Sequence, residues 1–409
     1  MSLGSRARRI GTVVAISALL AGSGIISANA FHDEVVAGVA AADGHGTRLD
    51  RAGLDRAMAE VVKAGMPGTF AEVRDGAQIW RGAAGVADLE TKAPVQSYFQ
   101  HRIASVTKTF TATAVLQQVA VGRIDLDAPI SRYLPTVMPI QRGRTITVRM
   151  LLDHTSGIAD NKRASLLKGS PDEVLAKLRK PYTVQELINL GLDEKPTSTP
   201  PGRTFGYSNT NYDIIELLLD KVTRQPAREY IKHHVIRAAG LRNTEFPGHI
   251  SVIHGPHSKE YEDLNGNLKP PMDFSGEHQR SWAGLNGGII STMADVNQFY
   301  RALLSGRLLP PAQLAEMKSG GGTPGYGLGL MLEEIGPCGL FLGHNGGSFG
   351  ASTDAYISLD GKRQFAVARN LTSHGKRPPG MPENQALKTA TANFMSMAAC
   401  GRPTTSPAG

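Results

Sequence analysis

A serine and a lysine, Ser105 and Lys108, lie three residues apart at the start of a segment with the spacing of an amphipathic helix. Residues at i and i+3 share one face of a helix, so the pattern brings a hydroxyl and an amine together. A serine hydroxyl attacks a carbonyl only when a neighbouring group takes its proton or stabilises its alkoxide, and Lys108 has the position of such a group. The spacing therefore predicts a serine nucleophile at a helix N-terminus.

The residues that follow Ser105 favour this helix. Bulky apolar side chains recur at helical intervals over residues 110–119, and Gly122 is a natural C-cap. Ser105 is then at the positive end of the helix, where free N–H groups stabilise developing negative charge. The same spacing recurs at Ser165 and Ser373, but the first lies in a polar stretch and the second is followed by two prolines, so neither has this context.

Two further short motifs lie downstream. Tyr207 and Asn209 stand between a turn-rich loop, residues 201–206, and a helical pattern over residues 212–219. A tyrosine can shuttle a proton and an asparagine can hold an amide. Residues 343–347, Gly-His-Asn-Gly-Gly, separate two apolar runs that are typical of strands.

In this order the three motifs resemble the signatures of the serine β-lactamase and penicillin-binding superfamily, which are S-x-x-K, Y-x-N and, on a strand, K-T-G or H-x-G. The chain is most similar to the class C branch and to the secreted D-alanyl-D-alanine carboxypeptidases, peptidase family S12. Residues 151–158, 287–292 and 326–330 also look like stretches of that family, and the resemblance runs from about residue 61 to residue 398. Alone, each motif has a structural interpretation, as a solvated lysine, a helix cap or a strand-end histidine. Their coincidence favours catalysis.

The resemblance implies a role for each motif residue. Ser105 attacks a carbonyl and forms an acyl-enzyme, while Lys108 and Tyr207 share the proton transfers. The charge of Lys108 is expected to lower the pKa of Tyr207. Asn209 is expected to hold the substrate amide.

The third motif is expected to bind the substrate through His344, Asn345 and Gly346. His344 takes the place of the family's lysine beside the tyrosine, and its charge is expected to vary near neutral pH. By resemblance the oxyanion hole combines the backbone N–H groups of Ser105 and Gly347. Neither a metal nor an organic cofactor is implied.

A competing motif covers residues 346–350, which fit the G-x-S-x-G nucleophile elbow of α/β-hydrolases with Ser348 as the serine. That elbow requires a strand, a sharp turn and then a helix. A hairpin pattern around Asp360 and Gly361 follows instead, so Ser348 is predicted to be structural.

Three positions depart from the carboxypeptidases of this type. Those enzymes carry a threonine after the histidine, a hydroxyl residue two further on, and an arginine after Y-G-L-G-L that receives a C-terminal carboxylate. Here the positions hold Asn345, Gly347 and Met331, so the strongest carboxylate receptor is lost unless Arg203 or another cation replaces it.

Three functions stay open. The first is a D-alanyl-D-alanine carboxypeptidase or β-lactamase-type enzyme, the second an esterase or amidase on the same fold, and the third a non-catalytic relative that binds penicillin or peptides. The expected partners are small molecules or peptides with a scissile amide or ester, possible examples being cell-wall peptides and β-lactams.

The first 30 residues have the composition of a secretory signal. Arg6, Arg8 and Arg9 precede an apolar run over residues 10–20 that is too short to span a bilayer, and residues 28–30, Ala-Asn-Ala, form a small-residue cleavage site. Cleavage after Ala30 is expected, with an uncleaved anchor as the alternative. Ordinary secretion is favoured over the twin-arginine export that Arg8 and Arg9 permit. The protein is therefore predicted to be secreted or extracytoplasmic.

The two cysteines, Cys338 and Cys400, fit a disulfide in an exported enzyme better than a metal site, and would tie the strand before His344 to the last helix. Of the net charge of +8, the signal segment supplies +3, leaving +5. This mild excess suits an enzyme near an anionic cell wall better than a nucleic-acid binder. Three histidines of one loop, His249, His254 and His257, lack the partners of a metal site.

The mature chain is expected to form one α/β (α+β) domain over residues 31–401. A helix near residues 54–64, a hairpin around Asp75 and Gly76, strands after Gly325 and a last helix near residues 384–397 predict an antiparallel sheet flanked by terminal helices. A mostly helical lobe, about residues 105–285, is inserted. The resemblance implies a β-lactamase/transpeptidase-like fold with the active site in the cleft between the two parts. The tail, residues 402–409, is predicted to be disordered and the protein to be a monomer.

Overall fold

The computed structural model describes residues 49–161, 169–247, 252–264, 270–276, 284–319, 325–374 and 383–403. The chain divides into two compact units, Met1–Thr47 and Arg48–Gly409, and every described residue belongs to the second. The expected signal segment, its cleavage site and residues 404–409 of the expected tail lie outside the described residues. None of the helices in the described ranges is long and apolar enough to cross a bilayer.

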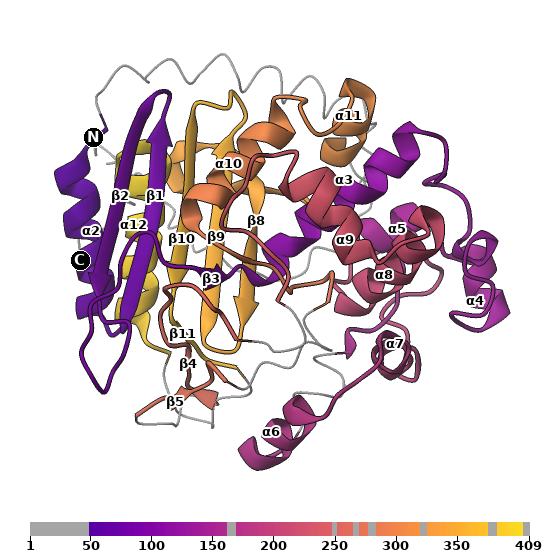
Figure 1. Ribbon diagram of the computed structural model, residues 1–409, viewed down its shortest axis with the longest axis horizontal. Coiled ribbons are helices and arrows are strands. Elements are labelled where there is room, and N and C mark those ends of the chain that lie inside the picture. The colour runs from indigo at the N-terminus through magenta and orange to yellow at the C-terminus, as the bar shows by residue number, and fades with distance from the viewer. Residues whose placement is uncertain are drawn as a thin grey trace, which may run out of the picture. The chain divides into compact units, whose positions relative to one another are not determined.

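A six-stranded antiparallel sheet with the order β2-β1-β10-β9-β8-β7 is the centre of the second unit (Figure 1). The strands are β1 (Gly68–Asp75), β2 (Gln78–Gly85), β7 (Met331–Glu334), β8 (Leu340–Ser348), β9 (Ala351–Ser358) and β10 (Arg363–Arg369). Strand β1 pairs with β10, with Phe70 opposite Ala368, so the two ends of the domain share one sheet. The predicted sheet of N- and C-terminal strands is confirmed.

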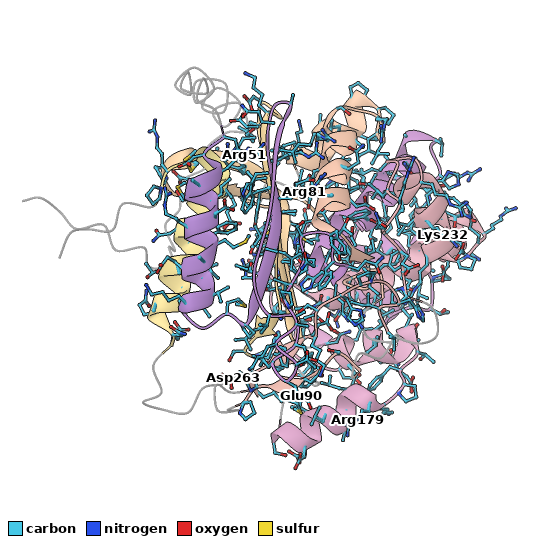
Figure 2. The ribbon with its side chains drawn as sticks, turned by 60° about the vertical axis from the view of Figure 1, so that its left-hand side comes forward. Arg51, Arg81, Glu90, Arg179, Lys232 and Asp263 are labelled. Carbon is cyan, nitrogen blue, oxygen red and sulfur yellow. A yellow bond between two sulfur atoms is a disulfide. The ribbon has the colours of Figure 1, made fainter. Side chains whose placement is uncertain are left out.

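The terminal helices α2 (Arg51–Lys63) and α12 (Gln385–Cys400) cover one face of this sheet (Figure 2). Leu54 of α2 and Phe394 of α12 pack there against Val73 and Phe365, all of them buried. Alternation along the strands supplies these apolar side chains, because every second residue of a strand faces the same side.

A disulfide joins Cys338, at the end of the short helix η7 (Gly336–Cys338), to Cys400, the last residue of α12. The two Cα atoms are 5.4 Å apart. The predicted pairing is thus present in the structure.

The opposite face carries the helical part of the chain (Figure 2). Helix α10 (Met293–Leu304) contacts β1, β9 and β10, and behind it lies α3 (Thr107–Ala120), where Phe110 stacks on Phe299 with ring centroids 3.5 Å apart. The remaining helices are η1 (Ala104–Val106), η2 (Ile130–Arg132), α4 (Ile140–Thr145), α5 (Val148–Leu152), α6 (Pro171–Arg179), α7 (Val184–Leu192), α8 (Asn209–Thr223), α9 (Ala227–Ile231), η4 (Lys232–Ile236) and α11 (Pro311–Ser319).

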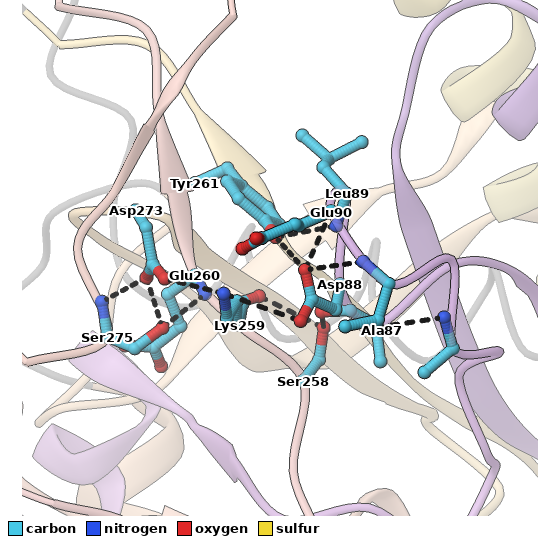
Figure 3. Close-up of polar contacts among 12 residues, drawn as sticks. Ala87, Asp88, Leu89, Glu90, Ser258, Lys259, Glu260, Tyr261, Asp273 and Ser275 are labelled. Atoms are coloured by element: carbon cyan, nitrogen blue, oxygen red, sulfur yellow. Dashed lines mark hydrogen bonds and ion pairs between the residues drawn. The ribbon is translucent and has the colours of Figure 1, made fainter.

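Two small sheets connect the helical part to the main sheet. They are β3 (His101–Arg102) with β6 (Ile290–Ser291), and β4 (Tyr261–Glu262) between β11 (Leu371–Thr372) and β5 (Met272–Asp273). Figure 3 shows how the second is anchored: Lys259 bridges Asp88 at 3.4 Å and Asp273 at 3.3 Å, and the Tyr261 hydroxyl accepts the Leu89 N–H at 2.7 Å. These contacts fix the middle of the chain beside the loop that follows β2.

Ser348, the serine of the competing G-x-S-x-G motif, is the last residue of β8. Gly350 turns the chain with φ +74°, and β9 begins at Ala351. This is a strand, a turn and a second strand, so the prediction that these residues form no nucleophile elbow is confirmed.

Candidate active site

Ser105 and Lys108 are in contact, as their spacing predicts. Ser105 lies half-buried in η1, which continues into α3, and the fully buried Lys108 donates from Nζ to Ser105 Oγ at 3.1 Å. The apolar residues of α3 bury this helix in the core between the main sheet and the helical part, which fixes the aliphatic part of the Lys108 side chain. A hydroxyl and an amine are therefore held together in a setting with little water, where their electrostatic interaction is strong.

The backbone around Ser105 is constrained. Ala104 has φ +46°, a left-handed conformation that is uncommon for a residue with a Cβ and costs on the order of 1 kcal/mol. Strand β8 passes so near that a Cβ at Gly346 would lie 3.0 Å from the Ser105 nitrogen. At Gly347, which is exposed, a Cβ would meet no atom within 4 Å. The Ser105 nitrogen thus lies beside Gly346, and the exposed Gly347 is the next residue of β8. The oxyanion role of Ser105 and Gly347 stays a prediction.

Lys108 makes two more hydrogen bonds, to Asn209 Oδ1 at 2.9 Å and to the Asn286 carbonyl at 2.6 Å. Behind these acceptors lie two buried carboxylates. Asp160 Oδ1 accepts Asn209 Nδ2 at 3.0 Å, and Asp213 Oδ1 accepts Asn286 Nδ2 at 2.6 Å. Each carboxylate is separated from Lys108 by one asparagine, and their negative charge offsets the free-energy cost of burying the lysine. The Asn209 side chain is engaged with Lys108 and Asp160, and its predicted role on the substrate stays a prediction.

Tyr207 comes to the same place from the loop that precedes α8. Lys108 Nζ lies 4.9 Å from the centroid of its ring, a cation–π distance. The ring is half-buried, with its centroid 4.2 Å from that of His154 and 6.4 Å from that of His344. The three sequence motifs therefore meet around Lys108.

His344 is buried, and both of its ring nitrogens have partners. Nδ1 faces the Asn345 carbonyl oxygen and so carries the proton, while Nε2 lies 2.9 Å from the Tyr326 hydroxyl. Burial raises the pKa of Tyr326 well above its usual value, so this hydroxyl stays a donor. Burial, together with the charge of Lys108, lowers the pKa of His344 to about 3. The ring is neutral at neutral pH, and the prediction of a charge that varies near pH 7 is wrong.

Sequence reasoning assigned no role to five residues of this cluster. Four of them lie in or beside a stretch that resembles the family, which could have signalled them, whereas Asp213 lies in the helical pattern that follows Asn209. The five residues are His154, Asp160, Asp213, Asn286 and Tyr326.

Comparison with known proteins places this site in a family. A family model described as Beta-lactamase matches residues 54–391. The chain belongs to this family, the serine β-lactamase and penicillin-binding superfamily.

Individual relatives include a D-stereospecific amidohydrolase, a putative penicillin-binding protein and a D-aminopeptidase. The crystal structure of a D-stereospecific amidohydrolase from Streptomyces sp. is 35% identical, with a TM-score of 0.71, covering 83% of this chain and 98% of that one. A putative penicillin-binding protein, PbpX, from Bacillus subtilis is 25% identical over 275 residues, 66% of this chain and 62% of the relative. A D-aminopeptidase from Cereibacter sphaeroides is 26% identical over 339 residues, 79% of this chain and 60% of the relative. The chain thus spans less than two thirds of the length of these two curated relatives.

The fold is that of the β-lactamase and transpeptidase family, as predicted.

Proposed function

We propose that this chain forms an acyl-enzyme on Ser105 and hydrolyses amides whose leaving group carries no carboxylate, with D-amino acid amides as the substrate class. The observation that carries the proposal is the 3.1 Å contact between Lys108 Nζ and the Ser105 hydroxyl, with Lys108 fully buried. A serine needs such a partner to act as a nucleophile at neutral pH.

Lys108 has the surroundings of an ammonium group. Its three N–H donors match three acceptors, Ser105 Oγ, Asn209 Oδ1 and the Asn286 carbonyl. In the proposed mechanism this cation stabilises the Ser105 alkoxide, and Tyr207, acting as the phenolate, accepts the serine proton.

The proposed reaction consists of acylation and then deacylation of Ser105. Ser105 Oγ bonds to the carbonyl carbon, and the negative charge moves to the carbonyl oxygen, facing the backbone N–H groups of Ser105 and Gly347. One such donor contributes about 10²–10³ in rate. The C–N bond breaks as Tyr207 returns its proton to the leaving nitrogen. Water then attacks the ester and gives one proton to Tyr207, which passes it to Ser105 Oγ as the acid leaves.

The choice of substrate rests on the absence of a cation at position 344. His344 is neutral, with its nitrogens held by Asn345 and Tyr326. Met331 packs in the cluster between the sheet and helices α2 and α12, where the Tyr356 hydroxyl lies 3.8 Å from its sulfur. Position 331 is thus on the face of the sheet away from Lys108, and its side chain does not decide the substrate. The neutral His344 presents no cation, so a terminal carboxylate gains nothing from it.

The relatives support the amide class. One is called a D-stereospecific amidohydrolase and one a D-aminopeptidase. The putative penicillin-binding relative supports a second candidate, a D-alanyl-D-alanine carboxypeptidase or β-lactamase-type enzyme. A non-catalytic binding role is disfavoured, because a pure binder has no use for a buried lysine against its serine.

Comparison of kcat/KM for four substrates separates these candidates. They are D-phenylalanine amide, L-phenylalanine amide, acyl-D-Ala-D-Ala and the C-terminally amidated form of that peptide. We expect D over L, and the amidated peptide to be hydrolysed at least as well as the free acid. Strong preference for the free acid would overturn the proposal. Arg203, exposed on the loop before Tyr207, is then the first candidate receptor, and loss of this preference in Arg203→Ala would assign it.

We also propose that the protein is exported and begins at Phe31 after cleavage. The Cys338–Cys400 disulfide supports export, because such bonds persist in oxidising compartments. N-terminal sequencing of the protein from the culture medium or cell envelope tests this. A cytoplasmic protein that retains its first 30 residues would contradict it.

A further inference from the structure

His154 binds the backbone N–H groups of both residues that flank Tyr207 in the sequence, although the mechanism above gives it no part. Its carbonyl oxygen accepts the Gly206 N–H at 2.8 Å, and its Nδ1 accepts the Ser208 N–H at 3.2 Å. Its ring lies against the Tyr207 ring, with centroids 4.2 Å apart and planes 35° apart. His154 therefore contacts the residue before Tyr207, the residue after it and the Tyr207 ring itself.

The hydrogen bonds define the chemical state of this histidine. Asn211 Oδ1 accepts the Ser156 hydroxyl at 2.7 Å, which directs Asn211 Nδ2 to His154 Nδ1 at 3.2 Å. Nδ1 thus faces two N–H donors, so it carries no proton and the ring hydrogen is on Nε2. In the described part of the chain, the buried Nε2 has no hydrogen-bond partner. Burial and the charge of Lys108 hold the pKa of His154 well below its usual value, which keeps the ring neutral.

The backbone at this position is strained and firmly held. His154 has φ +61°, a left-handed conformation that costs on the order of 1 kcal/mol for a residue with a side chain. The residues after it dock the loop that leads to Tyr207, since the Thr155 carbonyl accepts the Gly202 N–H at 2.8 Å. Strain at a buried histidine is retained when the surrounding structure requires that geometry.

We propose that His154 is a positioning residue, which fixes the Tyr207 hydroxyl relative to Ser105 and Lys108 so that the proton can be transferred. The inference rests on the proposed function, because it takes Tyr207 as the proton-transfer group. Proton transfer depends steeply on geometry, and a displacement of about 1 Å can cost about 10²-fold in rate. The side chain supplies two of the three contacts, the Nδ1 acceptor and the ring, and both can be removed by substitution.

A double-mutant cycle tests the proposal. The enzymes are the wild type, His154→Leu, Tyr207→Phe and the double variant, assayed with a D-amino acid p-nitroanilide. We expect His154→Leu to lower kcat about 10- to 100-fold with KM changed by less than about 3-fold. In the Tyr207→Phe background the same change should alter kcat by less than about 3-fold, because residues that act through one another are not additive. His154→Asn, whose Oδ1 can accept the Ser208 N–H, should recover part of the loss.

The outcomes separate the two proposals. An equal fold-loss from His154→Leu in both backgrounds would overturn the positioning role and leave the mechanism in place. Full kcat in Tyr207→Phe would overturn the mechanism and with it the role of His154. If His154→Leu does not fold, as judged by its thermal transition, the cycle is run with His154→Asn, and additivity there has the same meaning.

Discussion

Gly346 approaches Ile103 so closely that a Cβ at position 346 would lie 2.2 Å from the Ile103 carbonyl oxygen. That carbonyl is two residues before Ser105, in the turn that leads into η1. Strand β8 can therefore lie directly beside the turn that carries Ser105, because residue 346 has no side chain. The next residue, Gly347, has no such neighbour, so a substitution at Gly347 is a matched control for the same substitution at Gly346.

Gly346→Ala is expected to separate β8 from η1 and to lower kcat at least about 10-fold, because backbone atoms cannot yield as a flexible side chain does. Gly347→Ala keeps its N–H group and places its methyl in open space, so its thermal stability should match that of the wild type. Steady-state kinetics and thermal unfolding of both variants check this. A Gly346→Ala enzyme with full activity would show that β8 does not set the serine geometry.

Loss of the disulfide is expected to destabilise the domain. Cys338 and Cys400 are 62 residues apart, and closing such a loop contributes about 4 kcal/mol in the chain-entropy model. Denaturant unfolding of Cys338→Ser/Cys400→Ser should show a loss of that order. Thiol mapping of the unreduced protein should find no free cysteine, and two free thiols would refute the bond.

The free energy of unfolding is expected to decrease in acid because His101 is buried. Burial lowers the pKa of His101 to about 4 in the folded protein, while the unfolded chain has the usual value of about 6.5. Between these values the unfolded state binds one more proton, so the free energy of unfolding decreases as pH falls, by about 1.4 kcal/mol per pH unit. Above pH 6.5 this contribution is fully present.

His101→Gln provides the control for that slope. Glutamine can keep a donor to the Ser352 carbonyl, which His101 Nε2 contacts at 3.2 Å, and it does not titrate. The variant's free energy of unfolding should decline less steeply between pH 6 and pH 4, by about 1.4 kcal/mol per unit. Equal slopes would mean that His101 is protonated in the folded protein.

The elements with a regular apolar pattern could be predicted from the sequence. The helix after Ser105, the hairpin at Asp75 and the terminal helices lie close to where they were expected, because their side-chain periodicity is local. The Ser105–Lys108 contact follows from helix geometry alone.

The surroundings of these residues could not be predicted, because they depend on tertiary contacts. The neutrality of His344 results from burial and from the charge of Lys108, which lies far from it in the sequence. The carboxylates behind Lys108 reach it through Asn209 and Asn286, which come from distant parts of the chain. A pattern in one sequence identifies the type of group at such a site and not its charge state.

The central claim, that Ser105 is the nucleophile, is tested most directly by intact mass after exposure to a fluorescent penicillin and, separately, to a p-nitrophenyl ester. The account predicts one acyl adduct in the wild type, none in Ser105→Ala, and an adduct in Ser348→Ala, since only Ser105 has a lysine partner and a helix N-terminus. Peptide mapping should place the adduct on Ser105. An adduct that persists in Ser105→Ala and is lost in Ser348→Ala would contradict the account.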